Sequence, residues 1–128
     1  MRDPMIDHIS FAVSDLARSK VFYDAVLSPL GYARIWTIHN AAGYGLPGCD
    51  EVFAIREHAS IVVIPADRCH VAFSAPAHDS VERFHAAALA TGGTDEGPPG
   101  LCPEYGEGYF AAYVRDPDGY RIEAVFHA

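Results

Sequence analysis

Two histidine-bearing segments of the sequence repeat one another and carry side chains able to bind a metal. Residues 8–12 read His-Ile-Ser-Phe-Ala, and residues 70–74 read His-Val-Ala-Phe-Ser. Because side chains alternate between the two faces of a β-strand, His8 and His70 each share a face with small residues, and the large apolar residues lie on the opposite face. Small neighbours leave space beside each histidine for a bound group.

A carboxylate near the end of the sequence adds a third candidate ligand. Glu123 shares a strand face with Arg121 and Val125, and apolar residues typical of a core stand on the opposite face. A charge buried among apolar residues is costly unless it is paired, and a metal would pair it. Two imidazoles and one carboxylate suit zinc, divalent iron, manganese, cobalt or nickel, and three protein ligands leave positions open for water or substrate. We therefore predict a divalent metal held by His8, His70 and Glu123.

The same three residues also have a purely structural interpretation. The two histidines could be hydrogen-bonded core residues inherited from a duplication, and Glu123 alone would be an ordinary strand residue facing solvent. The three cysteines are widely spaced and form no Cys-x-x-Cys pair, which argues against both a disulfide framework and a thiolate zinc site. The other histidines lack a comparable setting and are interpreted as surface or structural residues: His39, His58, His78, His85 and His127.

Length and charge narrow the classes of function. The 128 residues are most simply one domain, and half of them are hydrophobic, so a packed core is expected. Seventeen acidic residues against nine basic ones give a formal charge of −8, a field that repels nucleic acid and anionic membranes. No apolar run approaches the roughly 20 residues of a membrane span, and residues 1–4 do not resemble a secretion signal. We expect a cytoplasmic protein that acts on a small molecule.

The predicted elements form two similar halves. A helix capped by Ser14 or Asp15 follows the first histidine strand, and a helix opened by an Asp79–Glu82 capping box follows the second. Three prolines and four glycines between residues 97 and 108 predict a long surface loop. The remaining predictions are strands at 32–39, 109–115 and 120–127, and a short, interrupted strand with a turn at 41–48. Residues 51–56 and 60–64 form either two strands or one bent ribbon, followed by a hinge at 65–68. An Asp-Pro-Asp-Gly hairpin turn is predicted at 116–119.

Several of these segments resemble those of a known superfamily. They are Ile-Asp-His-Ile at 6–9, Ala-Val-Leu-Ser-Pro-Leu-Gly-Tyr at 25–32 and Tyr-Val-Arg-Asp-Pro-Asp-Gly-Tyr-Arg-Ile-Glu at 113–123. The chain resembles the vicinal oxygen chelate superfamily, which contains glyoxalase I, fosfomycin-resistance transferases, extradiol dioxygenases and bleomycin-resistance proteins. The resemblance implies an α+β fold of two tandem βαβββ modules, at about residues 5–64 and 69–127. Their eight strands form an open, U-shaped barrel with flanking helices, usually in a homodimer.

The resemblance also implies roles for individual residues. Metal ligands in this superfamily fall on the first strand of each module and the last strand of the second, here His8, His70 and Glu123, and Glu123 can also act as the catalytic base. Glyoxalase I enzymes add a carboxylate from the last strand of the first module, but that strand has apolar residues at its centre here. A three-ligand site for zinc, manganese, nickel or iron is the better fit. We place the substrate-binding residues at Tyr113, Arg115 and Tyr105.

The expected function is a glyoxalase-like, metal-dependent lyase or isomerase. The metal would hold two oxygens of a small substrate and stabilise an enediolate or alkoxide. The first alternative is a metal-free protein of the bleomycin-resistance type, in which the acidic charge attracts a small cationic ligand. The others are a small extradiol dioxygenase that uses divalent iron and a thiol transferase that acts on a phosphonate.

Overall fold

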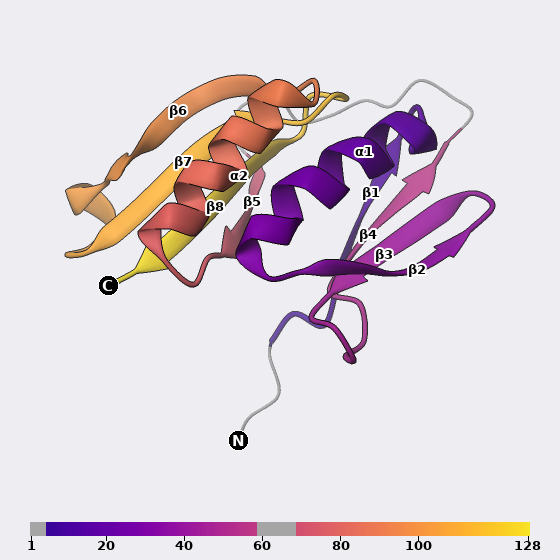
Figure 1. Ribbon diagram of the computed structural model, residues 1–128, viewed down its shortest axis with the longest axis horizontal. Coiled ribbons are helices and arrows are strands. Elements are labelled where there is room, and N and C mark those ends of the chain that lie inside the picture. Colours follow the sequence, from indigo (N-terminus) through magenta and orange to yellow (C-terminus); the bar gives the residue numbers. More distant parts are fainter. Residues whose placement is uncertain (1–4, 59–68) are drawn as a thin grey trace.

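The computed structural model describes residues 5–58 and 69–128, which form two modules of the same design (Figure 1). The predicted strand at 60–64, the hinge at 65–68 and the boundary of the first module at residue 64 lie outside the described residues. The first module contains β1 (Ile9–Val13), α1 (Leu16–Leu27), the 3₁₀ turn η1 (Ser28–Leu30), β2 (Ala33–Ile38), β3 (Ala41–Gly45) and β4 (Phe53–Glu57). The second contains β5 (His70–Ser74), α2 (His78–Ala90), β6 (Thr94–Leu101), the 3₁₀ turn η2 (Pro103–Tyr105), β7 (Tyr109–Arg115) and β8 (Arg121–His127).

Each module builds one four-stranded mixed sheet. The strand orders are β1-β4-β3-β2 and β5-β8-β7-β6, so the first strand of each module pairs in parallel with the last. The other neighbours pair antiparallel. The two sheets do not close on each other, which confirms the predicted α+β fold of two tandem modules with an open, barrel-like arrangement.

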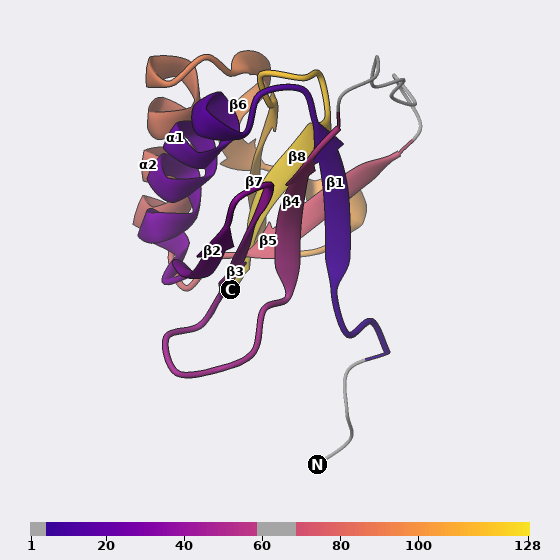
Figure 2. The same ribbon diagram turned by 90° about the vertical axis from the view of Figure 1, so that its right-hand side faces the viewer.

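The two helices lie side by side and cover one face of the sheets (Figures 1 and 2). Asp15 caps α1 as predicted, because its side chain accepts a hydrogen bond from the backbone of Arg18. The apolar stripe of α1, from Leu16 through Tyr23 to Leu27, is buried in the core. The opposite faces of the sheets, which carry the predicted ligands, therefore point away from the helices. Within the described ranges, no helix has the length and apolar character needed to cross a membrane.

Aromatic rings join the two modules. Phe11 of β1 stacks on Tyr120 of the β7–β8 turn with ring centroids 3.9 Å apart, and the Tyr120 hydroxyl donates a hydrogen bond to the Ala12 carbonyl. Phe53 of β4 meets Phe73 of β5 edge to face at 5.2 Å. These contacts make one continuous core, so the modules support each other's packing.

A buried hydrogen bond also crosses between the modules. Tyr23 of α1 donates its hydroxyl to the Asp116 carboxylate at 2.5 Å, and backbone N–H groups of Asp118 and Tyr120 donate to the other carboxylate oxygen. Asp116 is almost fully buried. The Asp-Pro-Asp-Gly turn thus does more than reverse the chain, since its first residue attaches the second module to α1.

Asp116 gives the stability of the protein a pH dependence. Burial raises the pKa of this carboxyl above its usual 3.8, although the hydrogen bonds from Tyr23 and the backbone oppose the shift. A carboxyl with a higher pKa in the folded state stabilises that state at low pH and loses this contribution as the pH rises through the folded pKa. We therefore expect the free energy of unfolding, relative to Asp116→Asn, to decrease as the pH rises above about 4, the usual pKa of an aspartate in an unfolded chain.

Urea unfolding at a series of pH values measures this difference. The matched control is Asp79→Asn, because Asp79 is an exposed carboxylate on α2 whose removal should leave the pH profile as it is in the wild type. A wild-type minus Asp116→Asn difference that stays constant over this range would contradict the assignment.

Two local predictions for the second module are wrong. The Asp79–Glu82 capping box does not form: the N-cap of α2 is Ala77, and Asp79 instead pairs with Arg83 one turn later. The predicted loop at 97–108 is in part a strand, because β6 continues to Leu101 through Pro98 and Pro99. Prolines are tolerated there because β6 is an edge strand, and its register with β7 shifts on either side of Gly97.

Candidate metal and substrate site

A buried carboxylate on β8 is the centre of the candidate site. Glu123 is only 1% exposed, and each of its oxygens has a partner. Its Oε1 lies 2.9 Å from His70 Nε2, and its Oε2 accepts a hydrogen bond of 2.5 Å from the Tyr109 hydroxyl. Two of the three predicted metal ligands, His70 and Glu123, are therefore adjacent in one chain.

The strand register explains why these side chains meet. In the parallel pairing of β5 with β8, Ala72 is opposite Glu123 and His70 is opposite Arg121. On the other side of β8, Tyr113 of β7 is opposite Glu123. The neighbours of Glu123 along β8, Ile122 and Ala124, belong to the core, so alternation directs Glu123 toward the face away from the helices. The small side chain of Ala72 leaves the space that His70 and Glu123 share.

Two tyrosines beside Glu123 are held in the protonated form. Burial and the hydrogen bond to Glu123 raise the pKa of Tyr109 to about 12. Burial and the nearby charge of Glu123 raise the pKa of Tyr113 still further above its usual value. Both hydroxyls are consequently hydrogen-bond donors at neutral pH, and that of Tyr109 fixes the orientation of the carboxylate.

These residues line a cavity of about 530 Å³ on the second sheet. The segment from Gly97 to Tyr105, which includes the end of β6 and the turn η2, forms one wall. A cavity of this size accommodates a small organic molecule. Its lining residues are His70, Glu96, Gly97, Pro98, Gly100, Leu101, Cys102, Glu104, Tyr105, Tyr109, Ala111, Tyr113, Arg121 and Glu123.

His8, the third predicted ligand, does not line this cavity. It stands immediately before β1 of the first module, where its Nδ1 lies 2.7 Å from Asp7 Oδ1 and its side chain is 54% exposed. The other charges that act on it, Glu51 and Arg56, belong to the same module. Over residues 5–58 and 69–128, no three His, Cys, Asp or Glu side chains come close enough to hold a metal ion within one chain.

The predicted substrate-binding residues separate into two groups. Tyr105 and Tyr113 line the cavity. Arg115 does not line the cavity. Its Nε donates a hydrogen bond to Glu96 at 2.8 Å, and its Nη1 donates one to the Gly119 carbonyl at 3.0 Å. The substrate-binding role of all three residues stays a prediction.

Three residues of the cavity are absent from the predicted set of site residues. Tyr109 is the hydrogen-bond partner of Glu123, and its place on the same strand face as Tyr113 was the signal that could have identified it. Arg121 lines the cavity, and its place on the Glu123 face of β8 was already visible in the sequence. Cys102 also lines the cavity, and burial raises the pKa of its thiol, which keeps it a weak nucleophile.

The first sheet has no counterpart of Glu123. Ala54 is opposite Ser10 in the β1–β4 pairing, as Glu123 is opposite Ala72 in the β5–β8 pairing. Ala54 thus takes the position of Glu123 in the repeat, where the fourth, glyoxalase I-type carboxylate would be expected. The first module therefore has an alanine, not a carboxylate, at this position, and the three-residue ligand set stays a prediction.

Comparison with known proteins identifies the family. Residues 5–124 match the family model described as the Glyoxalase/Bleomycin resistance protein/Dioxygenase superfamily. The chain belongs to this superfamily. A glyoxalase/bleomycin resistance protein from Albidiferax ferrireducens T118 is 32% identical, with a TM-score of 0.84 over 98% of this chain and 100% of that chain. The superfamily resemblance inferred from the sequence is thereby confirmed.

More distant structures share the fold alone. A glyoxalase-related enzyme from Fulvimarina pelagi is 23% identical, with a TM-score of 0.70 over 95% of this chain and 87% of that chain. The fosfomycin resistance protein FosX from Listeria monocytogenes is 19% identical, with a TM-score of 0.69 over 100% of this chain and 96% of that chain. No functionally curated protein matched the chain.

Superfamily members often bind divalent metals, and the His70–Glu123 pair fits such an ion. Neighbouring ligand atoms of a metal with bond lengths of about 2.1 Å lie about 3 Å apart in octahedral geometry, and His70 Nε2 and Glu123 Oε1 are 2.9 Å apart. Tyr109 also acts as an outer partner that orients the carboxylate, as second-shell groups do in metal sites. The second module therefore supplies two possible metal ligands, His70 and Glu123, together with Tyr109, whereas His8 lies in the first module.

Proposed function

We propose that this protein is a metal-dependent enzyme that acts on a small, oxygen-bearing substrate in the cavity of the second module. The observation that carries the proposal is the buried Glu123 carboxylate, paired with His70 and held by Tyr109 beside a cavity of about 530 Å³. His70 and Glu123 would hold the metal together with His8. The reaction class that these groups support is proton transfer of the lyase or isomerase type.

A bound divalent ion would supply Lewis-acid polarisation of the substrate oxygens. The side chains of the protein would transfer the proton, bind the substrate and exclude water. Glu123 takes up and returns a substrate proton at a carboxylate oxygen, and Tyr109 holds that carboxylate in position through Oε2. Tyr113 offers a protonated hydroxyl to a substrate oxygen. The wall from Gly97 to Tyr105 limits the access of water to the reacting atoms.

The proposal takes His8 from a second copy of the chain. In its own chain His8 is half-exposed and paired with Asp7, apart from the His70 cavity. In a two-fold symmetric dimer, His8 of each chain can approach His70 and Glu123 of the other, which completes two equivalent sites. Each chain would then contribute its first module to one site and its second module to the other.

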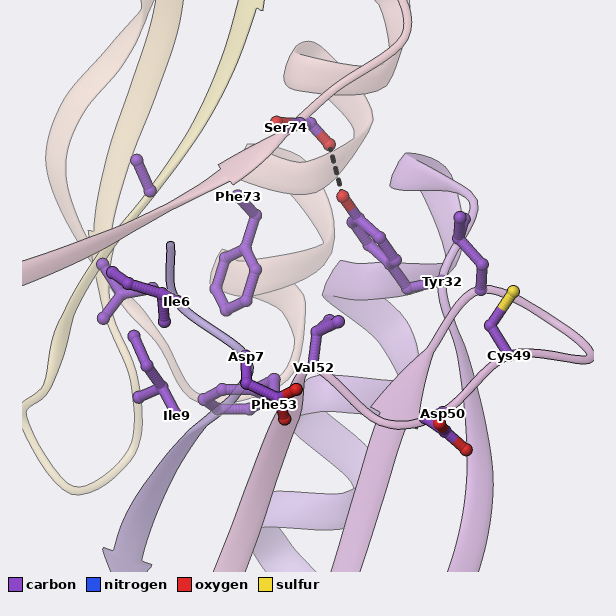
Figure 3. Close-up of a pocket in the computed structure, with 13 residues that line it drawn as sticks. Ile6, Asp7, Ile9, Tyr32, Cys49, Asp50, Val52, Phe53, Phe73 and Ser74 are labelled. Carbon is purple, nitrogen blue, oxygen red and sulfur yellow. Dashed lines mark hydrogen bonds between the residues drawn. The ribbon is translucent and has the colours of Figure 1, made fainter. Parts of the chain in front are cut away.

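An apolar groove beside His8 provides the surface for this contact (Figure 3). Ile6, Asp7 and Ile9 line one side of the groove, and residues 71–74, which follow His70, line the other. Ile6 is 58% exposed and Val52 is 48% exposed. Covering these side chains removes apolar surface from water, which favours association of two chains. The contact brings the segments that carry His8 and His70 to the interface.

Complementation between two inactive variants tests the shared site. His8→Ala and His70→Ala should each bind little zinc, because each lacks one ligand. When the two chains are coexpressed, half of the dimers are mixed, and each mixed dimer regains one complete site. Elemental analysis should therefore find about a quarter of the wild-type zinc content.

The zinc contents of the mixture and of the wild type test the shared site and the metal dependence separately. Zinc that stays absent from the mixture, although the wild type binds about one ion per chain, would show that His8 does not come from a second copy. A wild type that binds neither zinc, manganese, nickel nor anaerobic iron would overturn the metal-dependent function. It would favour the metal-free alternative, a protein that sequesters a small cation.

A further inference from the structure

The cavity contains a cation, Arg121, that has no ion-pair partner within residues 5–58 and 69–128. Arg121 lines the cavity, and its guanidinium lies over the ring of Tyr113, 5.6 Å from the ring centroid. Its Nε is buried and has no hydrogen-bond acceptor in the part of the chain that the structure describes. Among the described residues, no carboxylate forms an ion pair with it. The guanidinium therefore brings to the cavity a positive charge that no carboxylate of the described residues neutralises, and an anionic ligand is favoured.

The other described arginines of the second module, and the arginine of α1, form ion pairs with carboxylates. Arg18 pairs with Asp118, Arg83 pairs with Asp79, and Arg115 pairs with Glu96. Glu96 also lines the cavity, but its carboxylate is committed to Arg115. Glu123 is likewise committed to His70 and Tyr109. Among the described residues that line the cavity, Arg121 therefore provides the positive charge that is not neutralised by a carboxylate.

The position of Arg121 relates it to the candidate metal ligands. It precedes Glu123 by two residues on the same face of β8, which places the two Cα atoms about 7 Å apart. In the β5–β8 pairing it is opposite His70. A molecule of a few heavy atoms therefore reaches from the guanidinium to the His70–Glu123 pair. Tyr113, which is opposite Glu123 on β7, adds a protonated hydroxyl to the lining of the same cavity.

We propose that Arg121 binds an oxyanion group of the substrate, so that the substrate is a small acid whose neighbouring hydroxyl or carbonyl oxygen points toward His70 and Glu123. The second half of this statement rests on the proposed function, whereas the oxyanion contact with Arg121 does not. A guanidinium offers two parallel N–H donors to a carboxylate or a phosphonate, and both groups have the chemistry required. Stacking on Tyr113 holds the guanidinium in the cavity.

NMR titration of the full chain with three probes tests the proposal. The probes are glycolate, hydroxymethylphosphonate and the neutral ethylene glycol, each added to metal-loaded and to chelator-treated protein. We expect Arg121→Gln to weaken binding of the preferred oxyanion about tenfold to a hundredfold. The affinity for ethylene glycol should not change. The ratio of the wild-type affinities for glycolate and hydroxymethylphosphonate decides between the carboxylate and the phosphonate.

Two further variants keep the test decisive. Arg83→Gln makes the same change of charge on the exposed side of α2 and should leave oxyanion binding as in the wild type. Arg121→Lys keeps the charge without the paired donors, so it should fall between the wild type and Arg121→Gln, and it replaces that variant if glutamine prevents folding. Equal oxyanion affinity in the wild type and Arg121→Gln, or no oxyanion binding by the wild type, would overturn the proposal. Arg121-dependent binding in protein that takes up no metal would support the anion contact and count against the proposed enzyme.

Discussion

Replacing Glu123 with glutamine should lower the affinity of the protein for a divalent metal by about 100-fold or more. Glutamine has nearly the shape of glutamate, so the cavity and the contact with Tyr109 keep their form. The change removes the negative charge and one strong oxygen donor from a position that is only 1% exposed. Isothermal titration with manganese, nickel and zinc measures the loss, and catalytic activity on any identified substrate should disappear with it.

Glu82→Gln is the matched control, since Glu82 is exposed on α2 and lies outside the cavity. Its metal affinity should equal that of the wild type. If Glu123→Gln bound metal as tightly as Glu82→Gln, then Glu123 would not be a ligand. The His70–Glu123–Tyr109 arrangement would in that case be a structural hydrogen-bond network.

Phe53→Ala should lower the free energy of unfolding by about 3–5 kcal/mol. The Phe53 side chain is 2% exposed and contacts the rings of Phe11, Tyr23 and Phe73, with centroid distances of 5.0, 4.8 and 5.2 Å. Two of these rings belong to the first module, like Phe53 itself, and the ring of Phe73 belongs to the second. Truncation leaves a cavity at the junction of the modules, so both should lose stability together in urea unfolding.

Val21→Ala provides the comparison, because Val21 is an exposed apolar residue on α1. Its effect should stay within about 0.5 kcal/mol. Both variants need the same protein concentration, because association of chains adds to apparent stability. A Phe53→Ala effect as small as that of Val21→Ala would show that the module junction contributes little to stability.

The sequence carried most of the information about the fold. The repeated His-x-small-Phe-small pattern placed β1 and β5, and the superfamily motifs supplied the two-module arrangement. Asp15 could be identified as a cap because a local hydrogen bond to the backbone decides that position. Asp79 and Glu82 have the spacing of a helix cap as well, but Asp79 forms an ion pair with Arg83 and does not cap α2. The strand β6 could not be predicted from its proline-rich sequence, because its extended conformation depends on pairing with β7, which is a tertiary contact.

The site was harder to predict than the fold. Alternation puts His70, Arg121 and Glu123 on corresponding faces, but the register between β5 and β8 decides which of them touch. The strand face that Tyr109 shares with Tyr113 could have placed it in the cavity, but its contact with Glu123 depends on the pairing of β7 with β8, which is a tertiary contact. His8 presents the opposite case, because its pattern matches that of His70 and yet the fold of one chain keeps it out of the cavity.

The outer strand of the second sheet has a consequence for the behaviour of concentrated protein. Pro98 and Pro99 occupy the stretch of β6 between Gly97 and Gly100, where the pairing with β7 is interrupted. Proline has no N–H group, so this edge lacks the donors that a strand from another molecule would need. The two prolines therefore protect the sheet against edge-to-edge polymerisation into fibres. The wall of the cavity at Pro98 can therefore keep its extended backbone without exposing a row of free N–H groups to other molecules.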